Sequence, residues 1–316
     1  MDNIYVALSA FAEFGSDPVD LLKSSGIPYA MHSTGKRITK VELAANAANA
    51  AVILAGVEPY DEEVLASLPA LRCISRCGVG VDAIDLAAAK RRNITVLNTP
   101  DIPTMAVAEL ALSFYLSLCR NLRPQANSMG NKKWVRLEAH LLSGRTIGII
   151  GFGRIGKKIA ELCKPFGVKL LVCDPFIAPD IVEEYGATAV DKETLLQNAD
   201  IISVHASKSG TGSLIIGRDD YYKMKKGSLL VNLSRGGMID EEGLIQALQT
   251  KHLAGAGLDV FDNEPYDGPL CDFENVILTP HSATQTIETR VAMEMECVDK
   301  ALRFLHNRID PNEKVI

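Results

Sequence analysis

Residues 142–156 read LSGRTIGIIGFGRIG, and this glycine-rich stretch decides the fold. A run of β-branched residues enters a Gly-x-Gly-x-x-Gly turn, and residues 157–166 continue with the apolar spacing of a helix. In such a unit Gly151 allows a tight turn, Gly153 lets the backbone approach a pyrophosphate, and Gly156 lets the helix pack close to the strand. The helix N-terminus then offers free N–H groups to the phosphates. The stretch therefore predicts a dinucleotide-binding βαβ unit.

A second strand is predicted at residues 169–172, and Asp174 follows it. A carboxylate at this strand end accepts hydrogen bonds from a ribose 2′-hydroxyl and repels a 2′-phosphate, so NAD is favoured over NADP. A lone Gly-x-Gly-x-x-Gly is weak evidence, since glycines in many ordinary βα turns only relieve strain. Here the strand before the turn, the helix after it and the acid at the right distance all agree.

Composition limits the classes of protein that this chain can represent. At 316 residues it is long enough for two domains, and 47% hydrophobic and 23% charged residues are typical of a soluble globular protein. A net charge of −6 argues against nucleic acid or an anionic membrane as the main partner. The N-terminus lacks the basic region of a signal peptide, and the most apolar stretch, 110–119, is far shorter than the ~20 residues that span a bilayer.

The seven cysteines are scattered, odd in number and without a C-x-x-C pair or a zinc-like spacing to histidine. Most lie in strand or helix patterns, where cysteine acts as a small hydrophobic residue. We therefore expect no metal site and a reduced, cytoplasmic setting.

Short β-branched runs alternate with helical periods along most of the chain, which predicts parallel α/β domains. Strands are predicted at 4–8, 51–55, 71–75 and 94–97, with helices at 18–24, 39–46, 61–68 and 84–92. A long apolar helix is predicted at 104–129, further strands at 201–205, 229–233, 256–261 and 276–278, and a final amphipathic helix at 286–307.

Three segments carry titratable groups just beyond predicted strands, where doubly wound sheets bind their ligands. They read LLVNLSRGG at 229–237, GLDVFDNEP at 257–265 and ILTPHSAT at 277–284. Arg235 can grip a carboxylate with its planar fork, although most arginines form surface ion pairs. A histidine such as His281 gains proton affinity beside a glutamate such as Glu264, and the pair can protonate a carbonyl oxygen as hydride reaches the carbon.

These motifs, in this order and spacing, closely resemble the NAD-dependent D-2-hydroxyacid dehydrogenases. SRCGVGVD at 75–82 is similar to the substrate loop of that family, so the resemblance covers nearly the whole chain. It implies two doubly wound parallel-sheet domains, in which a Rossmann cofactor domain at 100–284 is inserted into a flavodoxin-like substrate domain at 1–99 and 285–316. It also implies a homodimer joined through the cofactor domain.

The resemblance assigns a role to individual residues of this chain. Arg235 would hold the substrate carboxylate, His281 would be the acid/base and Glu264 its partner. Arg76, Val79 and Gly80 would bind substrate together with Arg235 and His281. The residues implied to bind NAD are Val107, Gly151, Gly153, Arg154, Ile155, Gly156, Asp174, His205, Ala206, Leu233, Ser234, Asp259, Ser282 and Ala283, with Asp259 on the nicotinamide carboxamide.

Two segments depart from the family pattern. Many members read His-x-Pro-x-Thr where this chain has HASKS at 205–209, which alters a loop bordering the cofactor. After His281 many relatives carry Ile-Gly or Val-Gly, whereas this chain has Ser282 and Ala283, so the wall near the nicotinamide differs.

The resemblance implies that the substrate is a small 2-hydroxy or 2-oxo acid, but it does not specify the side chain of that acid. Arg76 most resembles the phosphoglycerate dehydrogenase branch, without the regulatory domain that some members carry, but Ala55-Gly56-Val57 offers no cation where many of those enzymes present arginine. Glyoxylate, hydroxypyruvate, D-lactate-type acids and a phosphonate analogue remain alternatives to 3-phosphoglycerate. An alternative of another class is an NAD(H)-sensing interaction protein, because the C-terminal-binding co-repressors share this fold and motif set.

Overall fold

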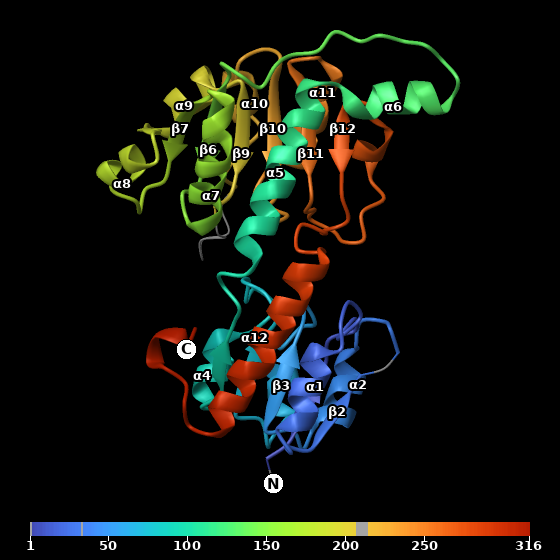
Figure 1. The fold of residues 1–316 in the computed structure, drawn as a ribbon, viewed down its shortest axis with the longest axis vertical. Coiled ribbons are helices and arrows are strands. Elements are labelled where there is room, and N and C mark those ends of the chain that lie inside the picture. The colour runs from blue at the N-terminus through green and yellow to red at the C-terminus, as the bar shows by residue number, and fades with distance from the viewer. Residues whose placement is uncertain (1, 33, 207–213) are drawn as a thin grey trace. The chain divides into compact units, whose positions relative to one another are not determined.

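The computed structural model describes residues 2–32, 34–206 and 214–316. The chain divides into two compact units, one formed by Met1–Pro103 with Thr284–Ile316 and the other by Thr104–Ala283. The sequence placed these divisions after residues 99 and 284. The segment up to Pro103 stays with the first unit because Ile102 packs against the core of that unit. Figure 1 shows the helices and strands of each unit.

The first unit is built on a parallel five-stranded sheet with helices on both faces. Its strand order, β2-β1-β3-β4-β5, is that of flavodoxin-like folds. Helices α2, α3 and α4 bury leucine, valine and alanine side chains on one face, while α1 and α12 cover the other. The strands are β1 Ile4–Val6, β2 Tyr29–Met31, β3 Val52–Ala55, β4 Cys73–Arg76 and β5 Thr95–Leu97, and the helices are α1 Asp17–Ser24, α2 Lys40–Ala47, α3 Glu62–Ala66, α4 Leu86–Arg91 and α12 Ile287–Leu305.

The second unit is built on a parallel seven-stranded sheet of order β12-β11-β10-β9-β6-β7-β8. Counted from β6, this is the Rossmann order with one further strand at an edge. The strands after β6 are added on one side of it as far as β8, and those from β9 onward are added on its other side. Sheets of this kind bind ligands at the point where the strand order reverses, here between β6 and β9. The strands are β6 Thr146–Ile150, β7 Lys169–Cys173, β8 Thr188–Ala189, β9 Ile201–Val204, β10 Ser228–Asn232, β11 Leu253–Leu258 and β12 Val276–Leu278.

Helices cover both faces of this second sheet (Figure 1). The apolar residues of α5, α7 and α8 pack on one face, and those of α9, α10 and α11 pack on the other. The fully buried strands β9 and β10 are mainly apolar, as expected of a parallel sheet covered on both sides. The helices are α5 Pro103–Cys119, α6 Leu122–Gly130, α7 Arg154–Cys163, α8 Pro179–Glu184, α9 Lys192–Asn198, α10 Asp220–Lys223 and α11 Glu241–Gln249.

The prediction of one long helix over 104–129 is wrong, since α5 ends at Cys119 and α6 begins at Leu122. Between them Asn121 adopts a left-handed conformation with φ 49° and ψ 43°, and its side-chain amide donates to the Glu138 carbonyl at 2.6 Å. Pro124 explains the break. In a continuous helix its ring would clash with the carbonyl four residues earlier, whereas the first turn of a new helix tolerates it.

The two-domain parallel α/β fold expected from the sequence is confirmed, with smaller differences at individual elements. Strands β2 and β8 were missed, and α7 begins at Arg154 rather than at residue 157, because Gly153 already caps the helix. Within the described part of the chain, no helix combines the length and the apolar character needed to cross a membrane.

Candidate active site

The turn between β6 and α7 contains three glycines with different surroundings. Gly151 has φ 92°, and a Cβ placed on it would lie 2.5 Å from the Ala206 amide nitrogen. A Cβ on Gly156 would overlap the Gly151 carbonyl oxygen, so α7 packs tightly under the turn. By contrast, a Cβ on Gly153 would meet nothing within 4 Å, and its φ of −72° suits any residue. The fold itself therefore requires Gly151 and Gly156 but leaves open space in front of Gly153.

Asp174 lies just after β7 and is tied to this same turn. Its carboxylate accepts the Phe152 amide at 2.7 Å and the Phe176 amide at 2.9 Å. Phe152 stands between the first two glycines, so the negative charge is fixed directly beside the mouth of the turn. This position suits a carboxylate that binds a ribose hydroxyl, and it disfavours an additional phosphate there.

Arg235 follows β10 in a turn organised by a buried asparagine. The Asn232 side chain donates to the Arg235 carbonyl at 3.1 Å and accepts from the Ser234 amide and hydroxyl at 3.0 and 2.6 Å. A Cβ on Gly236 would overlap the Phe261 carbonyl oxygen, so this turn lies directly against the loop that follows β11. The glycine thus brings Arg235 close to the loop that carries Glu264.

Glu264 and His281 form a hydrogen-bonded pair across two loops. Glu264 Oε2 lies 2.9 Å from His281 Nδ1, while Glu264 Oε1 accepts the Phe261 amide at 3.1 Å. Phe261 stacks on Tyr266 with ring centroids 4.3 Å apart, which braces the Glu264 loop from below. Both partners are partly exposed, with 47% of the His281 side chain and 38% of the Glu264 side chain accessible. The pair is therefore fixed yet reachable from solvent.

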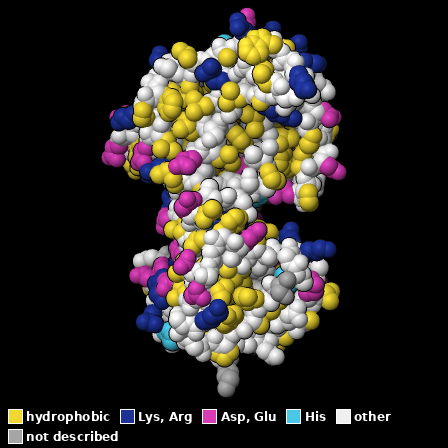
Figure 2. Space-filling model, turned by 45° about the vertical axis from the view of Figure 1, so that its right-hand side comes forward, with side chains coloured by type: hydrophobic (Ala, Val, Ile, Leu, Met, Phe, Trp, Pro, Cys, Tyr) yellow, Lys and Arg dark blue, Asp and Glu magenta, His cyan; other side chains and the backbone are white. Residues whose placement is uncertain are grey.

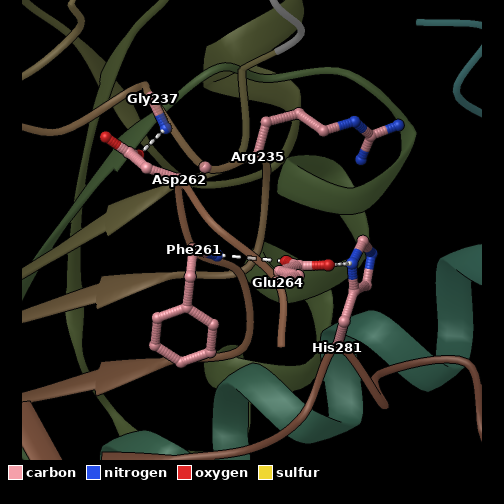
Figure 3. A pocket seen from close by; sticks show the side chains of 7 residues that line it. Arg235, Gly237, Phe261, Asp262, Glu264 and His281 are labelled. Carbon is pink, nitrogen blue, oxygen red and sulfur yellow. Dashed lines mark hydrogen bonds and ion pairs between the residues drawn. The ribbon is translucent and has the colours of Figure 1, made fainter. Parts of the chain in front are cut away.

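These side chains surround one hollow of about 480 Å³, lined by Arg235, Gly236, Gly237, Phe261, Asp262, Glu264 and His281. Figure 3 shows the guanidinium of Arg235 and the imidazole of His281 on the same side of the loops. Asp262 turns back to accept the Gly237 amide, so its carboxylate is engaged within the wall. The hollow offers a cation for an anionic ligand and a histidine whose Nε2 faces away from its carboxylate partner.

Asp259 is buried at the end of β11, with 1% of its surface exposed. Its carboxylate accepts hydrogen bonds from Thr279, Ser282 and Ala283, all in the loop that carries His281. The expected contact with a nicotinamide carboxamide remains a prediction. What the structure adds is a role for Asp259 in holding its neighbouring loop.

The other residues expected at the cofactor have varied surroundings. Val107, Leu233 and Ala283 are buried in one apolar cluster, and Ile155 packs against it. Arg154, at the start of α7, is exposed. Apolar side chains thus pack together near an exposed arginine at the start of α7. The contacts of each of these residues with NAD stay predictions.

His205 is held inside the second unit. Its Nε2 lies 2.6 Å from the Ser203 hydroxyl, which also receives the Tyr115 hydroxyl at 2.6 Å. Burial lowers the pKa of His205 to about 3, so its imidazole stays neutral. A neutral, half-buried histidine tied to Ser203 supports the scaffold, and the contact of His205 and Ala206 with the cofactor stays a prediction. The altered loop continues at residues 207–209, which lie outside the described residues.

The residues expected to bind substrate in the first unit follow β4. Arg76 donates to the Cys77 carbonyl, and the Gly78 amide donates to the Thr99 hydroxyl at 2.7 Å. The amides of Val79 and Gly80 have no hydrogen-bond acceptor among the described residues. Two such neighbouring N–H groups can bind an anion.

Two residues of the site were not singled out from the sequence. Asn232 shapes the Arg235 turn, and Thr279 ties the His281 loop to Asp259. Asn232 could have been recognised as a polar residue at the end of an otherwise apolar strand run, because such a residue is buried only with hydrogen-bond partners. For Thr279 the sequence contains no comparable signal.

Comparison with known proteins shows the family that this chain resembles. The family model described as "D-isomer specific 2-hydroxyacid dehydrogenase, NAD binding domain" matches residues 112–283. A glyoxylate reductase from Thermococcus litoralis is 36% identical over 83% of this chain and 82% of its own length. A protein of known structure, TT0316 from Thermus thermophilus, has a TM-score of 0.90 and 30% identity, with 99% of this chain and 100% of that chain covered.

A D-3-phosphoglycerate dehydrogenase from Synechocystis sp. is 37% identical over 79% of this chain but only 46% of its own length. The chain thus spans about half the length of the phosphoglycerate dehydrogenases that it matches.

Proposed function

The chain belongs to the D-2-hydroxyacid dehydrogenase family, and on this basis we propose that it transfers a hydride reversibly between NAD(H) and C2 of a small 2-hydroxy or 2-oxo acid. One observation carries the proposal. The Glu264–His281 pair and Arg235 line a single hollow at the carboxyl edge of a Rossmann sheet. Acid/base and carboxylate-binding groups are thereby available together, at the same edge of the sheet as the predicted cofactor turn.

In this proposal Arg235 binds the carboxylate of the acid and orients C2. Because Nδ1 of His281 is engaged by Glu264, Nε2 is left to give a proton to the C2 oxygen during reduction and to remove it during oxidation. Glu264 fixes the imidazole ring and stabilises its protonated form. The amides of Val79 and Gly80, together with Arg76, are assigned to the substrate.

The cofactor residues present fit NAD. Gly153 leaves room where a pyrophosphate would approach, the N-terminus of α7 can present backbone amides to it, and Asp174 can accept from a ribose hydroxyl. When bound, NAD(H) accepts or supplies the hydride. The second unit contains the matched NAD-binding domain of the family, so its contribution would be to hold the cofactor.

The substrate side chain is not fixed by these residues. Similar proteins are called D-3-phosphoglycerate dehydrogenase and glyoxylate reductase, so both a phosphorylated and a very small 2-oxo acid belong in the first screen. A panel of 2-oxo acids with NADH, followed by loss of NADH absorbance, tests the proposal. Turnover of at least one acid supports a dehydrogenase, whereas tight NADH binding without any turnover would favour the sensing alternative.

A second copy of this chain is the proposed protein partner. Helix α6 and residues 131–141 expose large apolar side chains, with Met129 54%, Trp134 76% and Leu141 72% accessible. Figure 2 shows hydrophobic side chains gathered on the visible face of the second unit, with charged side chains mainly at its margin. Apolar exposure of this kind is typical of interfaces. Sedimentation of the wild type against Trp134→Glu tests this, since the variant should shift toward monomer.

A further inference from the structure

His281 adopts a backbone conformation that a histidine seldom takes. Its φ is +50°, in the left-handed region, and its amide donates to the Thr279 carbonyl at 2.9 Å. For a residue with a Cβ this conformation is unfavourable and persists only where the surroundings enforce it. The group that enforces it directly follows the neighbouring strand, β11.

The enforcing group is the carboxylate of Asp259, which grips the loop on both sides of His281. Oδ1 accepts the Thr279 hydroxyl at 2.5 Å and the Ser282 amide at 2.7 Å, and Oδ2 accepts the Ala283 amide at 3.0 Å. Hydrogen bonds to a buried carboxylate are stronger than those between neutral groups. The loop is thus pinned two residues before and one residue after the histidine.

Asp259 is itself held by the strand that leads to the other half of the site. Its amide donates to the Asn232 carbonyl at 3.1 Å, and the side chain of Asn232 organises the turn that carries Arg235. The hydrogen bonds of Asn232 and Asp259 therefore connect the arginine turn to the histidine loop. Groups that must act together need such fixed support.

We propose that Thr279 and Asp259 are positioning residues for His281: their hydrogen bond holds the loop so that the imidazole meets Glu264 and directs Nε2 into the hollow. This inference rests on the proposed function. It is compatible with a nicotinamide contact, because a carboxylate has about four acceptor positions and the loop uses three.

Thr279→Val is the sharpest test, because it keeps the branched shape and removes only the hydroxyl. Thr279→Ser retains the hydroxyl and should restore function. Thr250→Val is the matched control, since that hydroxyl donates to the Gln246 carbonyl at the end of α11, away from the site. If Thr279→Val fails to fold, Asp259→Asn replaces it, because it weakens the same grip.

We expect kcat for 2-oxo acid reduction to fall about 10²-fold in Thr279→Val, as for a misplaced catalytic group, with NADH affinity unchanged. The imidazole NMR signal of His281, identified by its loss in His281→Gln, should move to a different chemical shift, because the imidazole meets Glu264 less well. Thr279→Ser and Thr250→Val should behave like the wild type.

Wild-type kcat and an unchanged His281 NMR signal in Thr279→Val would overturn the inference, even if that variant melts at a lower temperature. The NMR signal does not depend on turnover. A wild type that reduces no 2-oxo acid would therefore refute the proposed function, while the NMR signal would still decide whether Thr279 positions the histidine.

Discussion

Both units of this chain place a glycine turn at the carboxyl edge of a parallel sheet, and the two turns are filled differently. After β4 in the first unit, Gly78 has φ 132°, and the position of its missing side chain is taken by the guanidinium of Arg76. After β6 in the second unit, Gly153 has an ordinary φ and empty space before it. One glycine makes room for the chain's own side chain, and the other leaves room for something that the chain does not supply.

The difference shows that the architecture alone does not specify a ligand site. Two parallel sheets with helices on both faces differ in the residues at their carboxyl edges, and those residues determine whether a ligand can bind. In the second unit the edge combines an open turn, a helix N-terminus and a supported acid/base pair. If this edge performs the chemistry, substitutions of its ligand-facing residues should change activity or cofactor binding, whereas substitution of a glycine that only shapes the turn should change stability.

The largest effect is expected from His281→Ala. Loss of a positioned general acid/base should reduce kcat by about 10²–10⁴-fold, while folding and NADH binding persist because the turn after β6 is untouched. Steady-state kinetics with an NADH titration measures both. Glu264→Gln should be milder, because the imidazole of His281 is still present and loses only its charged partner. Full activity of His281→Ala would remove the histidine from the mechanism.

Arg235→Ala should come next. Removing a charged contact to a bound carboxylate should cost about 2–5 kcal/mol in kcat/KM, with NADH affinity nearly intact. The internal bonds of Asn232 with Ser234 should keep the turn in place, so a circular dichroism melt close to that of the wild type is the control. A variant with normal kcat/KM would make Arg235 a surface ion-pair residue.

Asp174→Ala tests cofactor choice at the mouth of the glycine turn. The wild type should bind NADH well and NADPH poorly. The substitution should weaken NADH binding by about 1.5–3 kcal/mol, the range for a hydrogen bond to a charged group. It should also narrow the difference in affinity between NADH and NADPH. Fluorescence titrations with both cofactors measure this. Equal affinities in the wild type would contradict the assignment of Asp174.

The smallest effect, and the one closest to the comparison of turns, separates Gly153 from Gly151. Gly153→Ala should leave the melting temperature unchanged, because the new Cβ would meet no atom of the protein within 4 Å. It should weaken NADH binding, because the Cβ would occupy the space where the pyrophosphate is proposed to approach. Gly151→Ala should destabilise the protein by about 1–2 kcal/mol or more, since alanine at φ 92° is strained. If both variants lost only stability, the space before Gly153 would have no link to the cofactor.

The sequence predicted the fold class because apolar runs alternate with helical periods and because the glycine turn stands between a strand and a helix. Strand β2 escaped notice, since Tyr29–Met31 is short and largely exposed. The break at Asn121 depended on Pro124, whose effect an apolar pattern hides.

Among the site residues, the sequence placed Arg235, Glu264 and His281 after successive strands, and the structure brings all three to one hollow. The hydrogen bonds from the His281 loop to Asp259 could not be predicted, because they depend on the left-handed conformation of His281, which follows Thr279, and on contacts across neighbouring loops. Residue type and spacing indicate which groups reach an edge but not which of them hold others in place.

The central claim is direct hydride transfer to C2, and isotope transfer tests it most directly. NADH carrying deuterium at both hydrogen positions of the nicotinamide C4 is incubated with the wild-type protein and a 2-oxo acid that it reduces, and the product is analysed by mass spectrometry and chiral chromatography. The account predicts a D-2-hydroxy acid with one deuterium at C2. A product without deuterium at C2, or no product from any 2-oxo acid despite NADH binding, would contradict it.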